Sequence, residues 1–129
     1  MDLEPDLKWA VRKVAQALHD YAFEHQWKKS DYCMDIVVNL DWGGFLVTFA
    51  AKQFQGQDGF QRFKEVQDYL EAKLKKYPVI VREINLIVKD RAAYLAENPF
   101  PVGPPDYRVP EEDLKPPRRR ATKTKGKNR

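Results

Sequence analysis

The chain has 129 residues, of which 43% are hydrophobic and 33% charged, a balance typical of one globular domain. No segment approaches about 18 consecutive apolar residues, and the first residues lack the basic start and apolar core of a signal peptide, so neither a membrane span nor secretion is expected. The single cysteine, Cys33, excludes an internal disulfide and fits a reducing compartment, so we expect a cytoplasmic location.

The net charge of +4 is distributed unevenly along the chain. Residues 115–129 hold eight of the 23 basic residues and no acidic residue, which leaves residues 1–114 with 15 bases against 19 acids and a net charge of −4. Domains that bind phosphates through their own surface usually carry an excess of basic residues. The strongest polyanion signal therefore lies in the tail, and the acidic body weighs against a phosphate-binding domain.

A first helix is expected from Pro5 to about Trp27, because proline suits the first helical turn and apolar residues then recur at spacings of three and four. At about 100° per residue, Trp9, Phe23 and Trp27 fall roughly opposite that apolar stripe. Either the proline-rich segment after residue 98 covers this aromatic face, or the face binds a protein partner or a second copy of the chain. A base-stacking platform is disfavoured, because Gln16 and Asp20, which lie between the aromatic residues on this face, are not basic.

Two strands are expected next, Cys33–Leu40 and Phe45–Lys52, because apolar residues alternate with other residues in both segments. The intervening Asp41-Trp42-Gly43-Gly44 is typical of a hairpin turn, since glycine tolerates positive φ angles. The short connection predicts antiparallel pairing. Trp42, at the tip of the hairpin, either folds back on the sheet or stays exposed.

A loop and a second amphipathic helix follow the hairpin. Gly56 allows a sharp turn in the loop, and Asp58 is a favourable N-cap that Gln61 would complete as a capping box. Lysines and then Pro78 mark the end of this helix. This passage from strand through glycine into helix is the stretch around which we expect the fold to be organised.

The same stretch resembles the core of the BolA family, over about residues 32–94. The family motif has Phe and then Val two residues later, Phe-x-Gly, and then Arg, Val and Leu along the second helix, and every interval fits without a gap. The residues that carry the resemblance are Phe45, Val47, Phe54, Gly56, Arg62, Val66, Leu70, Leu74, Pro78, Val79 and Ile84. The resemblance implies the KH-like fold of the second type and a binding role.

Three positions depart from the family pattern. BolA-like proteins have a histidine in the third strand that is linked to iron–sulfur binding shared with monothiol glutaredoxins, and Ile80 stands at the matching place. Gly44 stands where many members have a second histidine, and Lys89-Asp90 replaces the usual Thr-Pro before the last helix. Neither an aliphatic side chain nor a glycine can ligate a metal, so the departures argue against cluster chemistry here.

A third strand over Val79–Lys89 and a short helix over Asp90–Glu97 complete the expected domain, residues 1–98. The apolar pattern of this strand changes phase at Arg82-Glu83, which a bulge would reconcile. The predicted fold class is α+β in the order α-β-β-α-β-α, with a three-stranded mixed sheet of BolA/KH-like type.

Two segments follow the domain. The proline-rich extension, residues 99–117, is expected to be extended and to make no regular ladder, either as a spacer or anchored on the body by its apolar residues. Those anchors would be Phe100, Val102, Tyr107, Val109 and Leu114. The tail, residues 118–129, is basic with almost nothing apolar, which favours disorder.

The sequence offers no catalytic constellation. It has no glycine-rich phosphate loop, and His19 and His25 are spaced too far apart on one helix to share a metal. Cys33 has no basic neighbour in sequence that would activate its thiol. We therefore expect no enzyme activity, no cofactor and no metal.

The function expected from the sequence is that of a small adaptor that binds an unidentified protein partner, or a second copy, through a sheet edge or the face of Trp9, Phe23 and Trp27. One alternative is a KH-type regulator that binds nucleic acid with Arg62 and Lys64 as first contacts. A second alternative is an accessory protein for iron–sulfur clusters and glutaredoxins. In each reading the tail can add sequence-independent polyanion contacts. The basic tail residues are Arg118, Arg119, Arg120, Lys123, Lys125 and Lys127.

Overall fold

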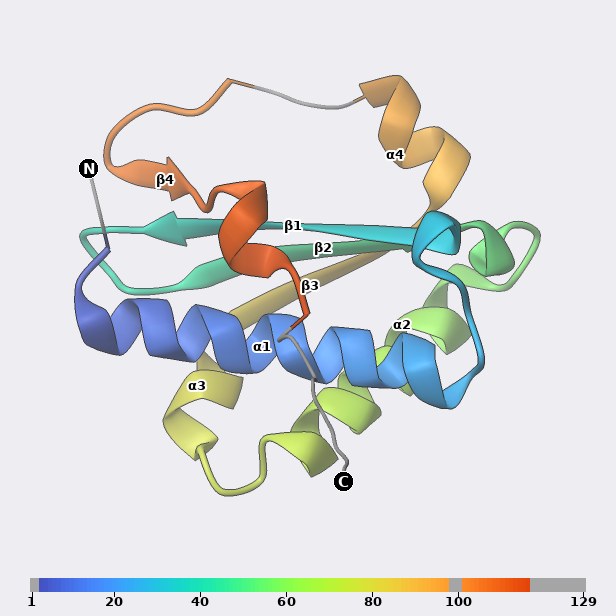
Figure 1. The fold of residues 1–129 in the computed structure, drawn as a ribbon, viewed down its shortest axis with the longest axis horizontal. Helices are drawn as coiled ribbons and strands as arrows, with labels where there is room; N and C mark the ends of the chain where they lie inside the picture. Colours follow the sequence, from blue (N-terminus) through green and yellow to red (C-terminus); the bar gives the residue numbers. More distant parts are fainter. Residues whose placement is uncertain (1–2, 98–100, 117–129) are drawn as a thin grey trace, which may run out of the picture.

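The computed structural model describes residues 3–97 and 101–116, and it shows an α+β fold (Figure 1). Within these residues a mixed sheet of four strands is combined with four α-helices and three short 3-10 helices. The elements are α1 (Pro5–Glu24), η1 (Lys29–Asp31), β1 (Tyr32–Asn39), β2 (Phe45–Ala51), η2 (Lys52–Phe54), α2 (Gly59–Lys73), α3 (Pro78–Arg82), β3 (Ile84–Asp90), α4 (Arg91–Glu97), β4 (Asp106–Arg108) and η3 (Glu111–Leu114).

The strand order in the sheet is β3-β2-β1-β4. β1 and β2 pair antiparallel as the predicted hairpin, with Ile36 opposite Val47. β3 runs parallel to β2, with Leu86 opposite Val47. The mixed sheet is thus confirmed, but the prediction of three strands is wrong. A fourth strand, Asp106–Arg108, pairs antiparallel with β1.

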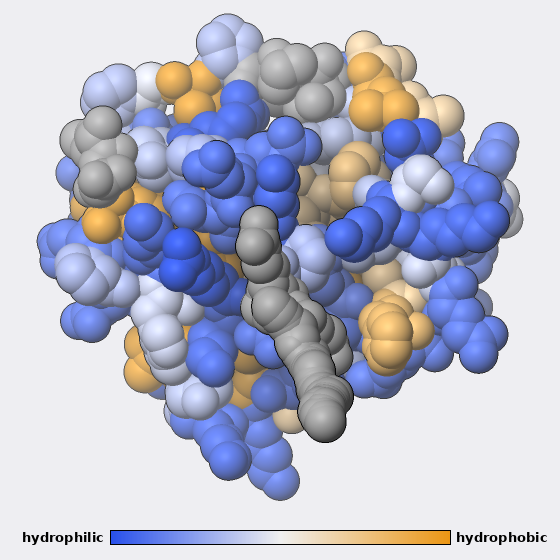
Figure 2. Space-filling view, in the orientation of Figure 1, coloured by the Kyte–Doolittle hydropathy of each residue, from blue (hydrophilic) through white to orange (hydrophobic). Residues whose placement is uncertain are grey.

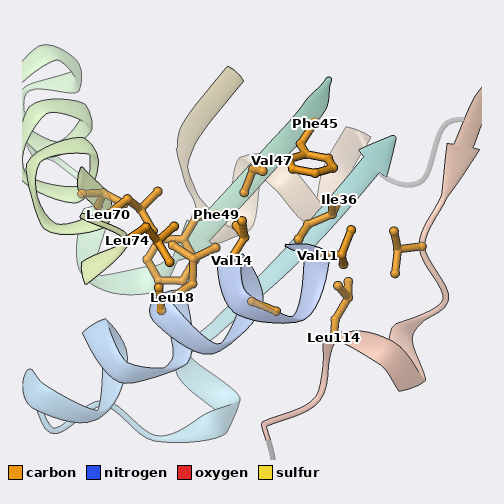
Figure 3. Close-up of a cluster of buried hydrophobic side chains, with 14 of the residues drawn as sticks. Val11, Val14, Leu18, Ile36, Phe45, Val47, Phe49, Leu70, Leu74 and Leu114 are labelled. Carbon is orange, nitrogen blue, oxygen red and sulfur yellow. The ribbon is translucent and has the colours of Figure 1, made fainter. Parts of the chain in front are cut away.

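The elements form layers about the sheet (Figure 1). α1, α2 and α3 lie on one side, whereas α4 and residues 101–105 lie on the other. The core fills the space between the sheet and α1 and α2, where side chains such as Leu18, Phe49 and Leu70 are buried (Figure 3). The inward residues of β2 are Phe45, Val47, Phe49 and Ala51, as their alternation predicts.

α1 begins at Pro5 as predicted but ends at Glu24, before Trp27. Gln26 has a φ of 63°, in the left-handed region, so the chain turns away from the helix axis immediately after the C-cap residue His25. The backbone N–H of Trp27 donates to the carbonyl of Ala22 and closes this turn. Helical phase therefore does not apply to Trp27.

The loop before α2 turns at Gly56, whose φ of 79° suits a residue without a side chain. The expected capping box is absent, because Asp58 makes no side-chain hydrogen bond to the helix start. The loop is instead held by Arg62, whose Nη1 donates to the carbonyl oxygen of Phe54 at 2.9 Å. Phe54 itself is buried in the core.

The segment predicted as the first half of the third strand is helical. Pro78–Arg82 forms α3, and β3 begins only at Ile84. The change of apolar phase at Arg82-Glu83 is therefore the junction between a helix and a strand, and the predicted bulge is wrong. β-branched residues favour a strand, but Pro78 occupies the first turn of the helix and Ile80 packs into the core.

The proline-rich extension contributes to both the sheet and the core, and the expectation that it makes no ladder is wrong. β4 pairs with β1, and the backbone N–H of Val109 donates to the carbonyl of Ile36. Val109 and Leu114 are buried, while Tyr107 is partly buried and Val102 is exposed. Leu114 approaches Val11 of α1 (Figure 3). Phe100 lies outside the described residues.

Candidate functional site: the outer face of the sheet

The face of the sheet turned away from α1 and α2, here called the outer face, carries two hollows on its strand surface. Strand alternation and the register place side chains from all four strands on it in rows. One row across the sheet is Arg108, Val37, Leu46 and Asn85, and the next is Asp35, Thr48 and Ile87. Within the described residues, α4 and residues 101–105 lie over part of this face (Figure 1).

The two hollows on the outer face lie next to each other and are together called the groove here. A hollow of about 390 Å³ lies at the hairpin end, and one of about 180 Å³ lies beneath α4. Val37, Leu46 and Asp106 line both, so the two hollows are adjacent. Trp42, Arg82 and Asn85 are among the residues of the first hollow, and Tyr94, Val102 and Ile87 are among those of the second.

The floor of the groove is apolar and partly open to solvent. Leu46 is 43% exposed and Ile87 is 39% exposed, although both lie within strands. At the open end Trp42 is 82% exposed, so the hairpin tip does not fold back on the sheet. Apolar side chains that are exposed together on one face are typical of interaction surfaces.

The charges around the groove are largely paired. Arg108 donates from Nε to Asp35 Oδ1 at 3.1 Å, and Lys89 forms an ion pair with Glu97 of α4. Burial, with a smaller contribution from Asp35, raises the pKa of Tyr94 to about 12, so its hydroxyl stays protonated and can donate at neutral pH. The groove thus offers apolar contact and a few oriented polar groups without a strong net charge.

The structure separates the three residues of the predicted aromatic face. Trp27 packs inside an aromatic cluster, with ring centroids 5.4 Å from Phe54 and 6.1 Å from Phe49. Trp9 is 46% exposed and Phe23 is 72% exposed, near opposite ends of α1. The described part of the proline-rich extension does not cover these residues, because it reaches α1 at Arg12 and His19 instead.

The predicted nucleic-acid contacts on α2 already have partners within the protein. Arg62 holds the loop carbonyl of Phe54, and its Nε atom is buried. Lys64 pairs with Asp68 one turn along the helix at 3.1 Å, and both side chains are exposed. The predicted tail contacts, Arg118 to Lys127, lie outside the described residues.

The positions linked to metal binding in BolA-like proteins do not form a ligand set. Ile80 is buried in α3, and Gly44 lies beside the backbone carbonyl of Glu83. Among residues 3–97 and 101–116, no three His, Cys, Asp or Glu side chains gather in a way that could hold a metal ion. Burial raises the pKa of the Cys33 thiol, which disfavours the reactive thiolate at neutral pH.

Sequence reasoning missed the groove, although one signal for it was present. Val37, Leu46 and Ile87 are apolar residues on the strand face opposite the core, and strands that are apolar on both faces are typical of sheets covered on both sides. The hollow itself depends on α4 and β4, which are placed by tertiary contacts.

No protein-family model matches the sequence, and no significant match is found among curated proteins or solved structures. No helix in the described part of the chain is long and apolar enough to cross a membrane. A function for this protein therefore rests on its own residues and geometry.

Proposed function

We propose that the protein is a small non-enzymatic adaptor of BolA/KH-like fold that binds a segment of a partner protein in the groove on its outer face. The observation that carries the proposal is the joint exposure of Leu46, Ile87 and Trp42 along a groove whose flanking charges are largely paired. An apolar floor with a polar rim fits a polypeptide better than a phosphate backbone.

The order of the elements supports the fold assignment. An antiparallel hairpin leads through Gly56 into α2, and the pair α2–α3 then connects β2 to the parallel strand β3. Replacement of the family histidine by Ile80, in a buried helical position, favours the adaptor over the iron–sulfur accessory. A protein that stays colourless when reconstituted with a monothiol glutaredoxin and iron would agree with this choice.

Selection from a displayed library of random peptides tests the proposed groove. Peptides are selected on the wild-type protein and counter-selected on the double variant Leu46→Asp/Ile87→Asp, which places charge on the apolar floor. We expect peptides that bind the wild type and lose at least tenfold in affinity for the variant by calorimetry. Their chemical-shift changes in the labelled protein should fall on the strands that line the groove.

Phe60→Asp is the matched control, because Phe60 is 71% exposed and belongs to α2. This variant should bind the selected peptides as the wild type does. An equal loss of peptide affinity in Phe60→Asp and in the groove variant would contradict the proposal. Chemical-shift changes confined to the helical side of the sheet would contradict it as well. A second copy of the chain could also occupy the groove. Sedimentation tests this: a wild-type dimer that the Leu46→Asp/Ile87→Asp variant disrupts would identify the partner as a second copy.

A further inference from the structure

A second groove lies on the helical side, between α1 and the turn that joins α2 to α3. Its volume is about 410 Å³, and its polar lining is mainly basic. Lys13 comes from α1, whereas Lys73, Lys75 and Lys76 come from the end of α2 and the following turn. Asp20 is the one acidic residue among the described residues that line it. The groove is thus locally positive on a body whose residues 1–114 carry a net charge of −4.

The lysines differ in how they are held. Lys73 lies 3.6 Å from Asp20 and 3.7 Å from Glu24, so acidic residues of α1 neutralise it. Lys75 and Lys76 are exposed and form no ion pair with any residue of the described ranges. Lysines at a helix C-terminus are favoured by the helix dipole, but that effect does not require a groove or aromatic neighbours.

An aromatic pair lies beside this groove, because Tyr77 is part of the lining and Trp9 packs on Tyr77 next to it. Trp9 and Tyr77 meet edge to face with their centroids 5.0 Å apart, and Trp9 is 46% exposed. The ammonium group of Lys13 lies 5.5 Å from the Trp9 ring and 5.8 Å from the Tyr77 ring. The fold therefore brings two aromatic rings from distant parts of the chain together with a cluster of lysines.

We propose that this groove binds a short stretch of single-stranded nucleic acid, with Lys75, Lys76 and Lys13 at phosphates and Trp9 stacked on a base. Single-stranded nucleic acids are recognised by this combination of a positive groove and an exposed aromatic ring. Acidic peptides would use the lysines but gain little from Trp9. Non-basic residues share the helix face of Trp9 and disfavour base stacking there, but Trp9 packs on Tyr77, which directly follows Lys75 and Lys76 and lines the groove with them.

Binding of a fluorescent mixed-sequence oligonucleotide of about 12 nucleotides to the full chain tests this proposal. The tail is kept in every variant, so that its own contacts stay constant. We expect Lys75→Gln/Lys76→Gln to weaken binding about tenfold and to reduce the slope of log affinity against log salt by about 1.4. Trp9→Ala should weaken binding about five- to 100-fold with little change in that slope.

Lys28→Gln/Lys29→Gln is the charge-matched control, since both residues are exposed, adjacent in sequence like Lys75 and Lys76, and outside the groove lining. Thermal unfolding by circular dichroism checks that every variant is folded. In a Trp42→Phe background, the oligonucleotide should also quench the fluorescence of Trp9, because Trp27 is packed in the core cluster.

Three results would overturn the proposal. The first is the absence of oligonucleotide binding by the wild type. The second is an equal loss for the groove variant and the charge-matched control, which would assign binding to the tail or to diffuse charge. The third is an oligonucleotide affinity that Trp9→Ala leaves unchanged, together with polyglutamate binding as tight as oligonucleotide binding. That result would assign the groove to acidic polypeptides. None of these outcomes tests the adaptor proposal, because that proposal concerns the groove on the outer face.

Discussion

His19 shows at the scale of one residue how the C-terminal segment is attached to the body. Its Nε2 donates to the carbonyl of Leu114 at 2.6 Å, while its Nδ1 accepts from the hydroxyl of Tyr32 at 2.7 Å. A neutral imidazole protonated at Nε2 satisfies both bonds. Burial lowers the pKa of His19, an effect only partly opposed by the Leu114 carbonyl and Asp20, and Lys29 lowers it further. The ring thus joins α1, β1 and η3 in its uncharged form.

Stability should consequently fall in mildly acidic solution. The pKa of His19 is lower in the folded protein than its unfolded value of 6.5, so below about pH 6.5 the unfolded chain takes up the proton first. The contribution of His19 is fully present above pH 6.5 and is lost as the pH falls through the folded pKa. Urea unfolding between about pH 7.5 and pH 5 should show this decline, and His19→Gln should reduce it. An unchanged pH dependence in the variant would contradict the assignment.

Arg62 is expected to act as a structural residue and not as a nucleic-acid contact. Its bond to the Phe54 carbonyl fixes the loop before α2, and its loss would leave that carbonyl without this partner. Arg62→Ala should lower the free energy of unfolding by about 1–3 kcal/mol. Lys64→Ala, with the same charge change at an exposed ion pair, should cost less than about 1 kcal/mol. Equal losses in chemical denaturation would show that Arg62 has no special structural role.

At the scale of elements, β4 and η3 complete the body. Residues 106–108 occupy the free edge of β1, and Leu114 closes the core beside Val11. Asp113 approaches Arg12 at 3.5 Å, which adds a weak exposed ion pair. Figure 2 shows that the face bearing α1 and η3 is mostly hydrophilic, with separate apolar patches such as one over α4. The extension thus buries apolar surface on this side of the molecule.

Truncation of single side chains in the extension should reveal this role. Leu114→Ala should lower the free energy of unfolding by about 2–5 kcal/mol, because Leu114 is buried in the core. Val102→Ala, at a residue 39% exposed, should change it by about 0.5 kcal/mol or less. Comparable values for the two variants would show that the extension is only a spacer.

The elements that were predictable carry their signals locally. The alternation of β2 and the glycine before α2 depend on neighbouring residues, and both predictions are confirmed in the structure. α3 was missed because Val79, Ile80 and Val81 favour a strand, whereas Pro78 and burial of Ile80 decide for a helix. β4 has three residues in a proline-rich segment and is a strand only because β1 offers it a partner. The lysine groove likewise depends on a long-range contact, the packing of Trp9 of α1 on Tyr77 after α2.

At the scale of the whole molecule, the sheet divides a tightly packed side from an open one. Val47 is fully buried, whereas Leu46 beside it is 43% exposed on the outer face. The proposed protein and nucleic-acid grooves lie on opposite sides of this sheet, so both can be occupied at once. The layers also predict that adjacent residues tolerate charge very differently.

Val47→Asp should unfold the protein, because an unpaired carboxylate in the core costs more than the few kcal/mol by which a domain of this size is stable. Leu46→Asp should change the melting temperature by only a few degrees, since the carboxylate can reach water. Circular dichroism melting of the two variants provides the comparison. A Leu46 variant as unstable as the Val47 variant would show that the outer face is closed in solution.

The long stretch of chain between β1 and β4 has a consequence for biosynthesis. β1 is made early, but the strand that pairs with its second edge emerges from the ribosome only after about seventy further residues. Until then, the nascent chain exposes an unprotected row of amides and carbonyls that another polypeptide could pair with. A premature stop before residue 106 would make that vulnerable state permanent, so the protein made from such a message should aggregate or be degraded.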